Sequence, residues 1–213
     1  MTNQDLGDQS DINPFVGPRA YQKDDGAMFK GRATEVEDIG YQVLGASVCL
    51  VYGDSGIGKT SLVQAGLTHW LEKHEITLDC ESCAAFDANT VRQDIKDTLR
   101  YYSPEGKQRG AICFDGFERV FDRTGSDKDT RVFFDELSAL IQRIPHTAVL
   151  LVMRSEWLAH LERYEWLLPD QLEDRYRIDP LSEVEASKMI VDVSKSPNSS
   201  HPFDPDAADW LVD

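Results

Sequence analysis

Glycine, lysine and hydroxyl side chains gather in one short stretch that follows an apolar run. The stretch is Gly53-Asp54-Ser55-Gly56-Ile57-Gly58-Lys59-Thr60, and it fits the phosphate-loop pattern G-x-x-x-x-G-K-[ST] at every fixed position. Its glycines let backbone N–H groups turn inward around an anion. The pattern predicts that Lys59 reaches the β- and γ-phosphates, that Thr60 binds Mg²⁺, and that Ser61 touches the α-phosphate. The alternative is a glycine-rich turn that holds no ligand.

Two carboxylates and one guanidinium are candidates for the rest of the chemistry. Asp115 ends an apolar run, which is where the metal-binding Walker B aspartate belongs. Glu118 follows three residues later and is a candidate general base that orients an attacking water. Arg154 also ends an apolar run, so we expect it at the carboxyl edge of a sheet, where it can sense a γ-phosphate. The plainer alternatives are that Asp115 caps a turn, that Glu118 is a solvated surface residue, and that Arg154 forms a salt bridge with a nearby carboxylate.

Strands that alternate with helices must position these residues. Apolar runs predict five strands, at residues 47–52, 75–80, 110–115, 147–153 and 175–179. Helices are predicted at about 33–44, 59–74, 87–102, 130–144 and 157–168, with two more beginning near 182 and 205. This alternation predicts an α/β fold, a three-layer α/β/α sandwich around a mainly parallel five-stranded sheet. The predicted segments are a tail (1–12), an arm and helix (13–46), the core (47–200) and a possible lid start (201–213).

Composition narrows the class of protein. The chain has 213 residues, with 22 Lys and Arg against 38 Asp and Glu, so its net charge is −16. Such a surface repels nucleic acid and anionic membranes over most of its area. With no signal peptide and no long apolar run evident, we expect a cytoplasmic protein. Cys80 and Cys83 form an isolated C-x-x-C without a second ligand pair, so no zinc site is predicted. Trp70, Trp157, Trp166 and Trp210 are interpreted as packing residues.

Five elements in order resemble the STAND class of P-loop NTPases, and in particular the novel STAND type of large bacterial multidomain proteins. They are the arm NPFVGPRAY and FKGRATEVE (13–21 and 29–37), the loop followed by LVQAGL, CFDGFERVF (113–121), MRSEW (153–157), and IDPLSEVEASKMI (178–190). The resemblance implies that the fourth strand lies between the Walker A and Walker B strands. It also implies that Arg154 lies beside the γ-phosphate and that Gly31 and Arg32 lie near the adenine or ribose.

This sequence departs from the family pattern in places that bear on activity. Gly116 stands where a polar residue is usual, and Arg119 replaces the second acidic residue after the Walker B strand. Glu118 alone remains of that acidic pair, so we expect slow hydrolysis at most. Family members continue into a helical and winged-helix lid, whereas this sequence ends soon after the predicted core. We therefore expect either an excised core or a short member that relies on a partner.

The leading functional hypothesis is a switch in which ATP or ADP, with Mg²⁺, sets conformation and assembly. By resemblance, its pathway is signalling or bacterial conflict response such as antiphage defence, with self-association or an effector as partner. A small-molecule kinase is an alternative, but the stretch RTGSDKDTR (123–131) makes a poor arginine-rich lid. An initiator-like or helicase-like ATPase is another, disfavoured by the net charge of −16. The sequence contains no N-K-x-D stretch for guanine, which favours ATP over GTP.

Overall fold

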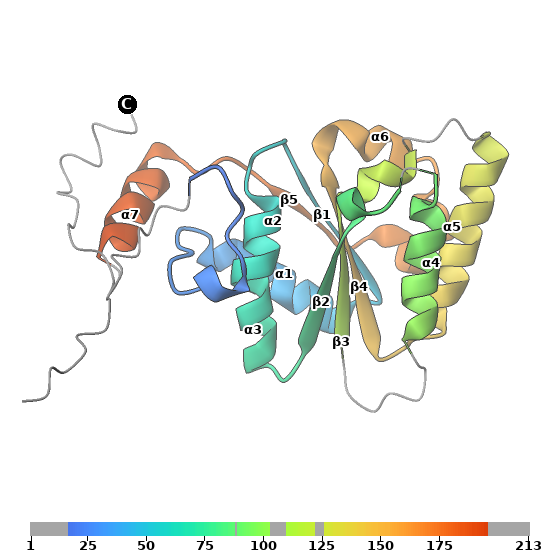
Figure 1. Ribbon diagram of the computed structural model, residues 1–213, viewed down its shortest axis with the longest axis horizontal. Coiled ribbons are helices and arrows are strands. Elements are labelled where there is room, and N and C mark those ends of the chain that lie inside the picture. The colour runs from blue at the N-terminus through green and yellow to red at the C-terminus, as the bar shows by residue number, and fades with distance from the viewer. Residues whose placement is uncertain (1–16, 88, 103–109, 122–125, 196–213) are drawn as a thin grey trace, which may run out of the picture.

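A parallel five-stranded sheet forms the centre of the protein in a computed structural model, which describes residues 17–87, 89–102, 110–121 and 126–195 (Figure 1). Its strands are β1 (Val48–Gly53), β2 (Thr77–Ser82), β3 (Gly110–Asp115), β4 (Thr147–Arg154) and β5 (Arg175–Ile178). They lie in the order β2-β3-β4-β1-β5, and every neighbouring pair is parallel. Strand β4 therefore lies between β1 and β3, as the sequence resemblance implies.

Helices cover both faces of the sheet. The longer ones are α1 (Ala33–Gly45), α4 (Val91–Tyr101), α5 (Asp127–Gln142) and α7 (Glu183–Ser194). A continuous helical rod follows the phosphate loop and consists of α2 (Lys59–Ser61), a π-helical segment (Leu62–Leu67) and α3 (Thr68–Lys73). Helices α1 and α3 lie on one side of the sheet, and α4 and α5 lie on the other (Figure 1). The predicted three-layer α/β/α architecture is confirmed.

Side chains of the three central strands alternate between two buried cores, because successive residues of a strand point to opposite faces. One face of the sheet packs against α4 and α5 through Val48, Leu50, Ile112, Phe114, Val149, Leu151 and Met153. The other packs against α1 and the helical rod through Cys49, Val51, Ala111, Cys113, Ala148, Leu150 and Val152. The strands are apolar throughout because both of their faces are covered, and their carboxyl ends are fixed in one rigid edge.

Phe134 is the centre of the core beneath α5, and its loss should be costly. The ring is fully buried and stacks on Tyr164 at a centroid distance of 5.2 Å. Because the cavity left behind would be lined by other aromatic rings, we expect Phe134→Ala to lower the free energy of unfolding by about 3–5 kcal/mol. Urea denaturation measures this loss. Val132→Ala, on the same helix but 47% exposed, should cost under about 1 kcal/mol. Equal losses would contradict this description of the core.

Three predicted boundaries were wrong, two of them for local reasons that the structure shows. Helix α5 begins at Asp127, not Thr130, because the Ser126 hydroxyl caps the helix by accepting from the Asp129 N–H at 3.2 Å. Strand β2 begins at Thr77 because Glu75 has a φ of 60°, a left-handed conformation that interrupts the backbone before the strand. The predicted helix 87–102 begins only at Val91.

The predicted helix 157–168 was also wrong. The segment contains a 3₁₀ turn (Ser155–Trp157), the single-turn helix α6 (Leu158–Leu161) and a second 3₁₀ turn (Glu165–Leu167). Buried Leu161, Tyr164 and Leu168 all pack into the α5 core, so tertiary contacts override the helical pattern. Within it, Trp166 is 52% exposed and lies beside the Arg131 guanidinium, which corrects its interpretation as a packing residue.

The predicted tail, the helix from Pro205, the lid start at 201–213 and Trp210 lie outside the described residues. The boundaries at 13–46 and 47–200 remain proposals. In the part of the chain that the structure describes, no helix is long and apolar enough to cross a membrane.

Candidate nucleotide-binding site

The phosphate loop joins the carboxyl end of β1 to the helical rod. Gly56 and Gly58 have φ values of +79° and +98°, which side-chain-bearing residues rarely adopt. These two glycines turn the backbone through the reversal that the motif requires. The turn is closed by the Ile57 N–H, which donates to the Asp54 carbonyl at 3.3 Å. The loop therefore has the strand-before, helix-after context in which backbone N–H groups cradle phosphate.

Lys59 lies across its own loop. Its ammonium donates to the carbonyl oxygens of Gly53 and Asp54, each at 2.8 Å. Burial lowers the pKa of Lys59, and the nearby carboxylates of Glu118 and Asp115 oppose that shift. The ammonium is thus held by neutral carbonyls over the loop, and it can exchange these bonds for stronger, charge-assisted bonds to phosphate oxygens.

Thr60 and Asp115 meet across the gap between the helical rod and β3. The Thr60 hydroxyl donates to a carboxylate oxygen of Asp115 at 2.6 Å. These are hard oxygen donors of the kind that Mg²⁺ prefers, so the pair fits a magnesium site. The described residues contain no group of three His, Cys, Asp or Glu side chains that could hold a metal. A Mg²⁺ ion here would therefore need phosphate oxygens and water for its remaining ligands, as is usual for this ion.

The Asp115 carboxylate is held at a cost to stability. Burial raises the pKa of Asp115, while the Thr60 hydroxyl and the Lys59 ammonium lower it less. A raised pKa in the folded state means that the charge destabilises the protein above that pKa, and that the penalty disappears as pH falls through it.

Removing the Asp115 charge should make the nucleotide-free protein more stable and should weaken its binding of Mg²⁺. We expect Asp115→Asn to raise the melting temperature of the nucleotide-free protein by roughly 2–4 °C, the shift that about 1 kcal/mol gives in a chain of this size. The same variant should lose the Mg²⁺ dependence of nucleotide binding. Thermal unfolding and calorimetric titration with and without Mg²⁺ test both parts. A lower melting temperature would contradict the assignment of Asp115 as a strained functional carboxylate.

Arg154 and Glu118 form a pair at the same edge of the sheet. Arg154 lies opposite Gly53 in the register of β4 and β1, which places it beside the start of the phosphate loop. Its Nε donates to Glu118 at 2.8 Å, and its backbone N–H donates to the same carboxylate at 3.3 Å. Glu118 is only 7% exposed, whereas Glu156, which also pairs with Arg154, lies in solvent. The two predicted residues are therefore brought together.

Gly31 and Arg32 lie in the wall of a cavity of about 540 Å³ that residues of the helical rod also line. The Arg32 guanidinium donates to the Asp179 carbonyl at 2.8 Å and pairs with Glu35. Ala65 is the first residue of the helical rod that lines the cavity. It lies roughly 9 Å along the rod from Lys59, at a rise of about 1.5 Å per residue. Its volume lies within the range typical of small-molecule sites.

Several residues at these sites were missed by the sequence interpretation. The cavity is also lined by Phe29, Lys30, His69, Trp70, Lys73, Lys188 and Met189. The helical spacing of 66, 69, 70 and 73 indicates one face of a helix, but no sequence signal shows that α7 lies opposite it. The arm before α1 also reaches Ser61 itself, because the Tyr21 N–H donates to the Ser61 hydroxyl oxygen at 3.1 Å.

Comparison with known families decides the class of this chain. The family model for Novel STAND NTPase 1 matches residues 14–200, which is most of the sequence. The chain belongs to the novel STAND NTPase 1 family. This novel STAND NTPase has no match among the curated proteins searched.

Solved structures show the same fold in distantly similar proteins, one of them a Walker-type ATPase and two of them holding nucleotides or their analogues. The Walker-type ATPase PABY2304 of Pyrococcus abyssi superposes with a TM-score of 0.62 at 10% identity, covering 94% of this chain and 66% of that one. The ORC2 protein of Aeropyrum pernix, in its ADPNP–ADP complexes, gives 0.63 at 13% identity, covering 96% and 60%. The replication initiator DnaA, bound to AMPPCP and single-stranded DNA, gives 0.56 at 15% identity, covering 90% and 59%. The novel STAND NTPase thus spans about three fifths to two thirds of these chains, and the likeness concerns the fold.

Proposed function

We propose that this novel STAND NTPase binds Mg-ATP and Mg-ADP and uses the difference between them as a conformational switch. One observation carries the proposal: Lys59, the Thr60–Asp115 pair and the Arg154–Glu118 pair converge at the carboxyl edge of β1, β3 and β4. This is the edge at which open α/β sheets bind their ligands. The convergence supplies a cation for phosphate, oxygen donors for a metal, and a carboxylate paired with a guanidinium.

Each residue has a proposed role. Lys59 and the loop N–H groups bind the β- and γ-phosphates, and Thr60 with Asp115 holds Mg²⁺, which neutralises phosphate charge when bound. Arg154 detects the γ-phosphate. Glu118 accepts a proton from the attacking water, but its 2.8 Å bond to Arg154 must loosen before it can do so. That restraint, together with Arg119 in place of a second acid, supports slow hydrolysis.

The cavity beside Gly31 and Arg32 is the proposed site of the adenine and ribose. Phe29, Trp70 and Met189 supply apolar surface there, and Lys30, Lys73 and Lys188 make no ion pair with any described residue. The carboxylates of Glu185 and Asp192 line the same cavity, so its wall offers both charged and apolar groups, which suits a polar ribose beside an apolar base. Adenine is preferred over guanine because the sequence has no N-K-x-D stretch.

The output of the switch is proposed to be assembly, through self-association or an effector domain, in cytoplasmic signalling or bacterial defence. Moving a conformational equilibrium from 1:99 to 99:1 requires about 5.5 kcal/mol of differential affinity. A γ-phosphate held by Lys59, Arg154 and Mg²⁺ makes charge-assisted bonds of the strength needed. Sedimentation of the protein in Mg-ADP and in a non-hydrolysable Mg-ATP analogue tests this output. We expect a larger assembly with the ATP analogue, and the same species in both would contradict the switch.

Nucleic acid is the partner to be tested second, because DnaA shares the fold and its structure contains single-stranded DNA. The net charge of −16 opposes such a partner for this chain. Fluorescence anisotropy with a labelled single-stranded oligonucleotide, with and without Mg-ATP, distinguishes the proposed switch from a nucleic-acid-binding ATPase. We expect no binding at about 150 mM salt. Saturable, ATP-dependent binding would favour an initiator-like ATPase instead.

A further inference from the structure

The arm before α1 (residues 17–32) lies along the helical rod that follows the phosphate loop. Gly26 lies so close to His69 that a Cβ on the glycine would be 2.3 Å from the imidazole ring. Phe29 also lies close to Gly66, where an added Cβ would approach the Phe29 ring to 2.8 Å. Lys23 pairs with Glu72 at the far end of the rod. The arm is therefore packed tightly against the rod over several turns, and its first contact, Tyr21 with Ser61, is at the phosphate-loop end.

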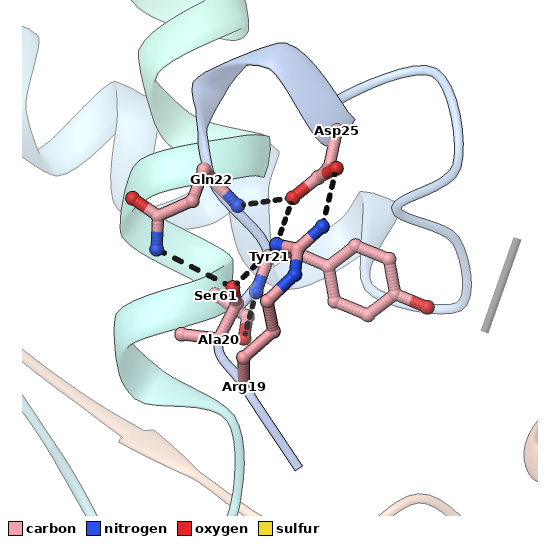
Figure 2. Close-up of polar contacts among 6 residues, drawn as sticks. All are labelled: Arg19, Ala20, Tyr21, Gln22, Asp25 and Ser61. Carbon is pink, nitrogen blue, oxygen red and sulfur yellow. Dashed lines mark hydrogen bonds and ion pairs between the residues drawn. The ribbon is translucent and has the colours of Figure 1, made fainter. Parts of the chain in front are cut away.

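A buried carboxylate sets the shape of this arm. Figure 2 shows Asp25 at the end of a short 3₁₀ turn (Lys23–Asp25), where it accepts two bonds from the Arg19 guanidinium, at 2.5 and 3.0 Å, and one from the Gln22 N–H at 2.8 Å. Asp25 is 8% exposed although it is charged. The Arg19 bond and the Gln22 N–H lower the pKa of Asp25, so the carboxylate stays ionised. These bonds fix the path of the chain between Arg19 and Asp25.

Tyr21 lies between Arg19 and Asp25, and its N–H is the group that reaches the phosphate loop. It donates to the Ser61 hydroxyl oxygen at 3.1 Å (Figure 2). A serine hydroxyl has one proton to donate and two lone pairs to accept with. Among the described residues, no hydrogen bond uses the Ser61 proton. The bond from Tyr21 therefore fixes the hydroxyl oxygen while leaving its proton available for an acceptor such as a phosphate oxygen.

We propose that Asp25 and Arg19 are positioning residues for nucleotide binding, and that they act by holding the Tyr21 N–H on Ser61 so that the Ser61 hydroxyl points its proton at the α-phosphate. The inference rests on the proposed nucleotide site. It adds that Asp25, which lies 36 residues before Ser61 in the sequence, influences how tightly that site binds nucleotide. Because a hydroxyl that accepts a bond becomes a better donor, arm docking and nucleotide binding reinforce each other. The α-phosphate is common to ATP and ADP, so the arm tunes affinity for both equally.

A double-mutant cycle tests this mechanism. Calorimetric titration with Mg-ADP and with a non-hydrolysable Mg-ATP analogue is carried out on wild type, Asp25→Asn, Ser61→Ala and the double variant. We expect Asp25→Asn to weaken both ligands by about fivefold to tenfold in wild type, but by less than about twofold in the Ser61→Ala background. Arg19→Gln, which leaves the Asp25 carboxylate in place, should repeat the pattern. Titrations are run well below the melting temperature of each variant.

Lys23→Ala is the matched control, because it breaks a contact between the same arm and the same helical rod without touching Ser61. The Lys23–Glu72 pair is exposed on both sides, and its loss should change affinity by less than twofold. A purely structural role for Asp25 would give equal losses in both backgrounds, and that additivity would overturn the proposal. If the wild-type protein bound neither ligand, the proposed nucleotide site itself would fail. Additive losses in a protein that binds nucleotide would instead reject only the role of the arm.

Discussion

Lys59→Ala is expected to weaken Mg-ATP binding by at least about 100-fold. The Lys59 ammonium is held by two carbonyl oxygens at 2.8 Å in the free protein, so it is already positioned over the loop. Its removal deletes a charge-assisted bond to phosphate in a partly buried site, and a 100-fold loss corresponds to about 2.7 kcal/mol. Fluorescence titration with a labelled ATP analogue measures the change.

Two variants control for charge and for folding. Lys96→Ala removes an equal charge from α4, where Lys96 pairs with Glu136 away from the phosphate loop, and it should leave affinity within twofold. Lys59→Arg keeps the charge but changes its geometry, so we expect an intermediate loss. Unchanged ATP affinity in Lys59→Ala would refute the assignment of the phosphate loop.

Glu118→Gln is expected to slow ATP hydrolysis by about 100- to 1,000-fold while nucleotide affinity stays within about threefold. General-base catalysis contributes factors of this size, and the amide cannot accept the proton of the attacking water. The substitution is nearly isosteric, so the amide oxygen can still accept a bond from Arg154. Single-turnover release of phosphate measures the chemical step apart from product release.

Glu156→Gln provides the comparison for this prediction. Glu156 also pairs with Arg154, at 2.9 Å, but its side chain is 56% exposed, so it has no buried position beside the loop. We expect hydrolysis in this variant to stay within about twofold of wild type. Unaltered turnover in Glu118→Gln would mean that the base lies elsewhere in the chain or on a neighbouring subunit.

The sheet and the phosphate edge could be predicted because their signals are local. Five apolar runs predicted strands within two residues of their observed ends. The loop motif also identified the strand that carries the phosphate loop at its carboxyl end. The position of β4 between β1 and β3 came from family resemblance, since nothing in an apolar run specifies its neighbours. Once that order holds, the register of Gly53 with Arg154 brings the proposed sensor to the loop.

The remainder depends on contacts between distant segments, which single-sequence patterns do not encode. The stretch 157–168 has a helical pattern, yet Tyr164 stacks on Phe134 and bonds to Asp127 at 2.5 Å, and the helix breaks into turns. The cap at Ser126 follows the S-x-x-D pattern, but it precedes the start that the apolar pattern predicts for the helix, at residue 130. The bond from Tyr21 to Ser61 spans 40 residues and uses a backbone donor, so no residue type signals it.

Native mass spectrometry of the purified protein, with and without Mg-ATP, tests the central claim most directly. The measurement counts bound nucleotides and subunits in the same spectrum. We predict that the chain carries one ADP or ATP per subunit and that Mg-ATP changes the number of subunits. A chain that stays free of nucleotide in saturating Mg-ATP, with Lys59→Ala giving the same spectrum, would contradict the account.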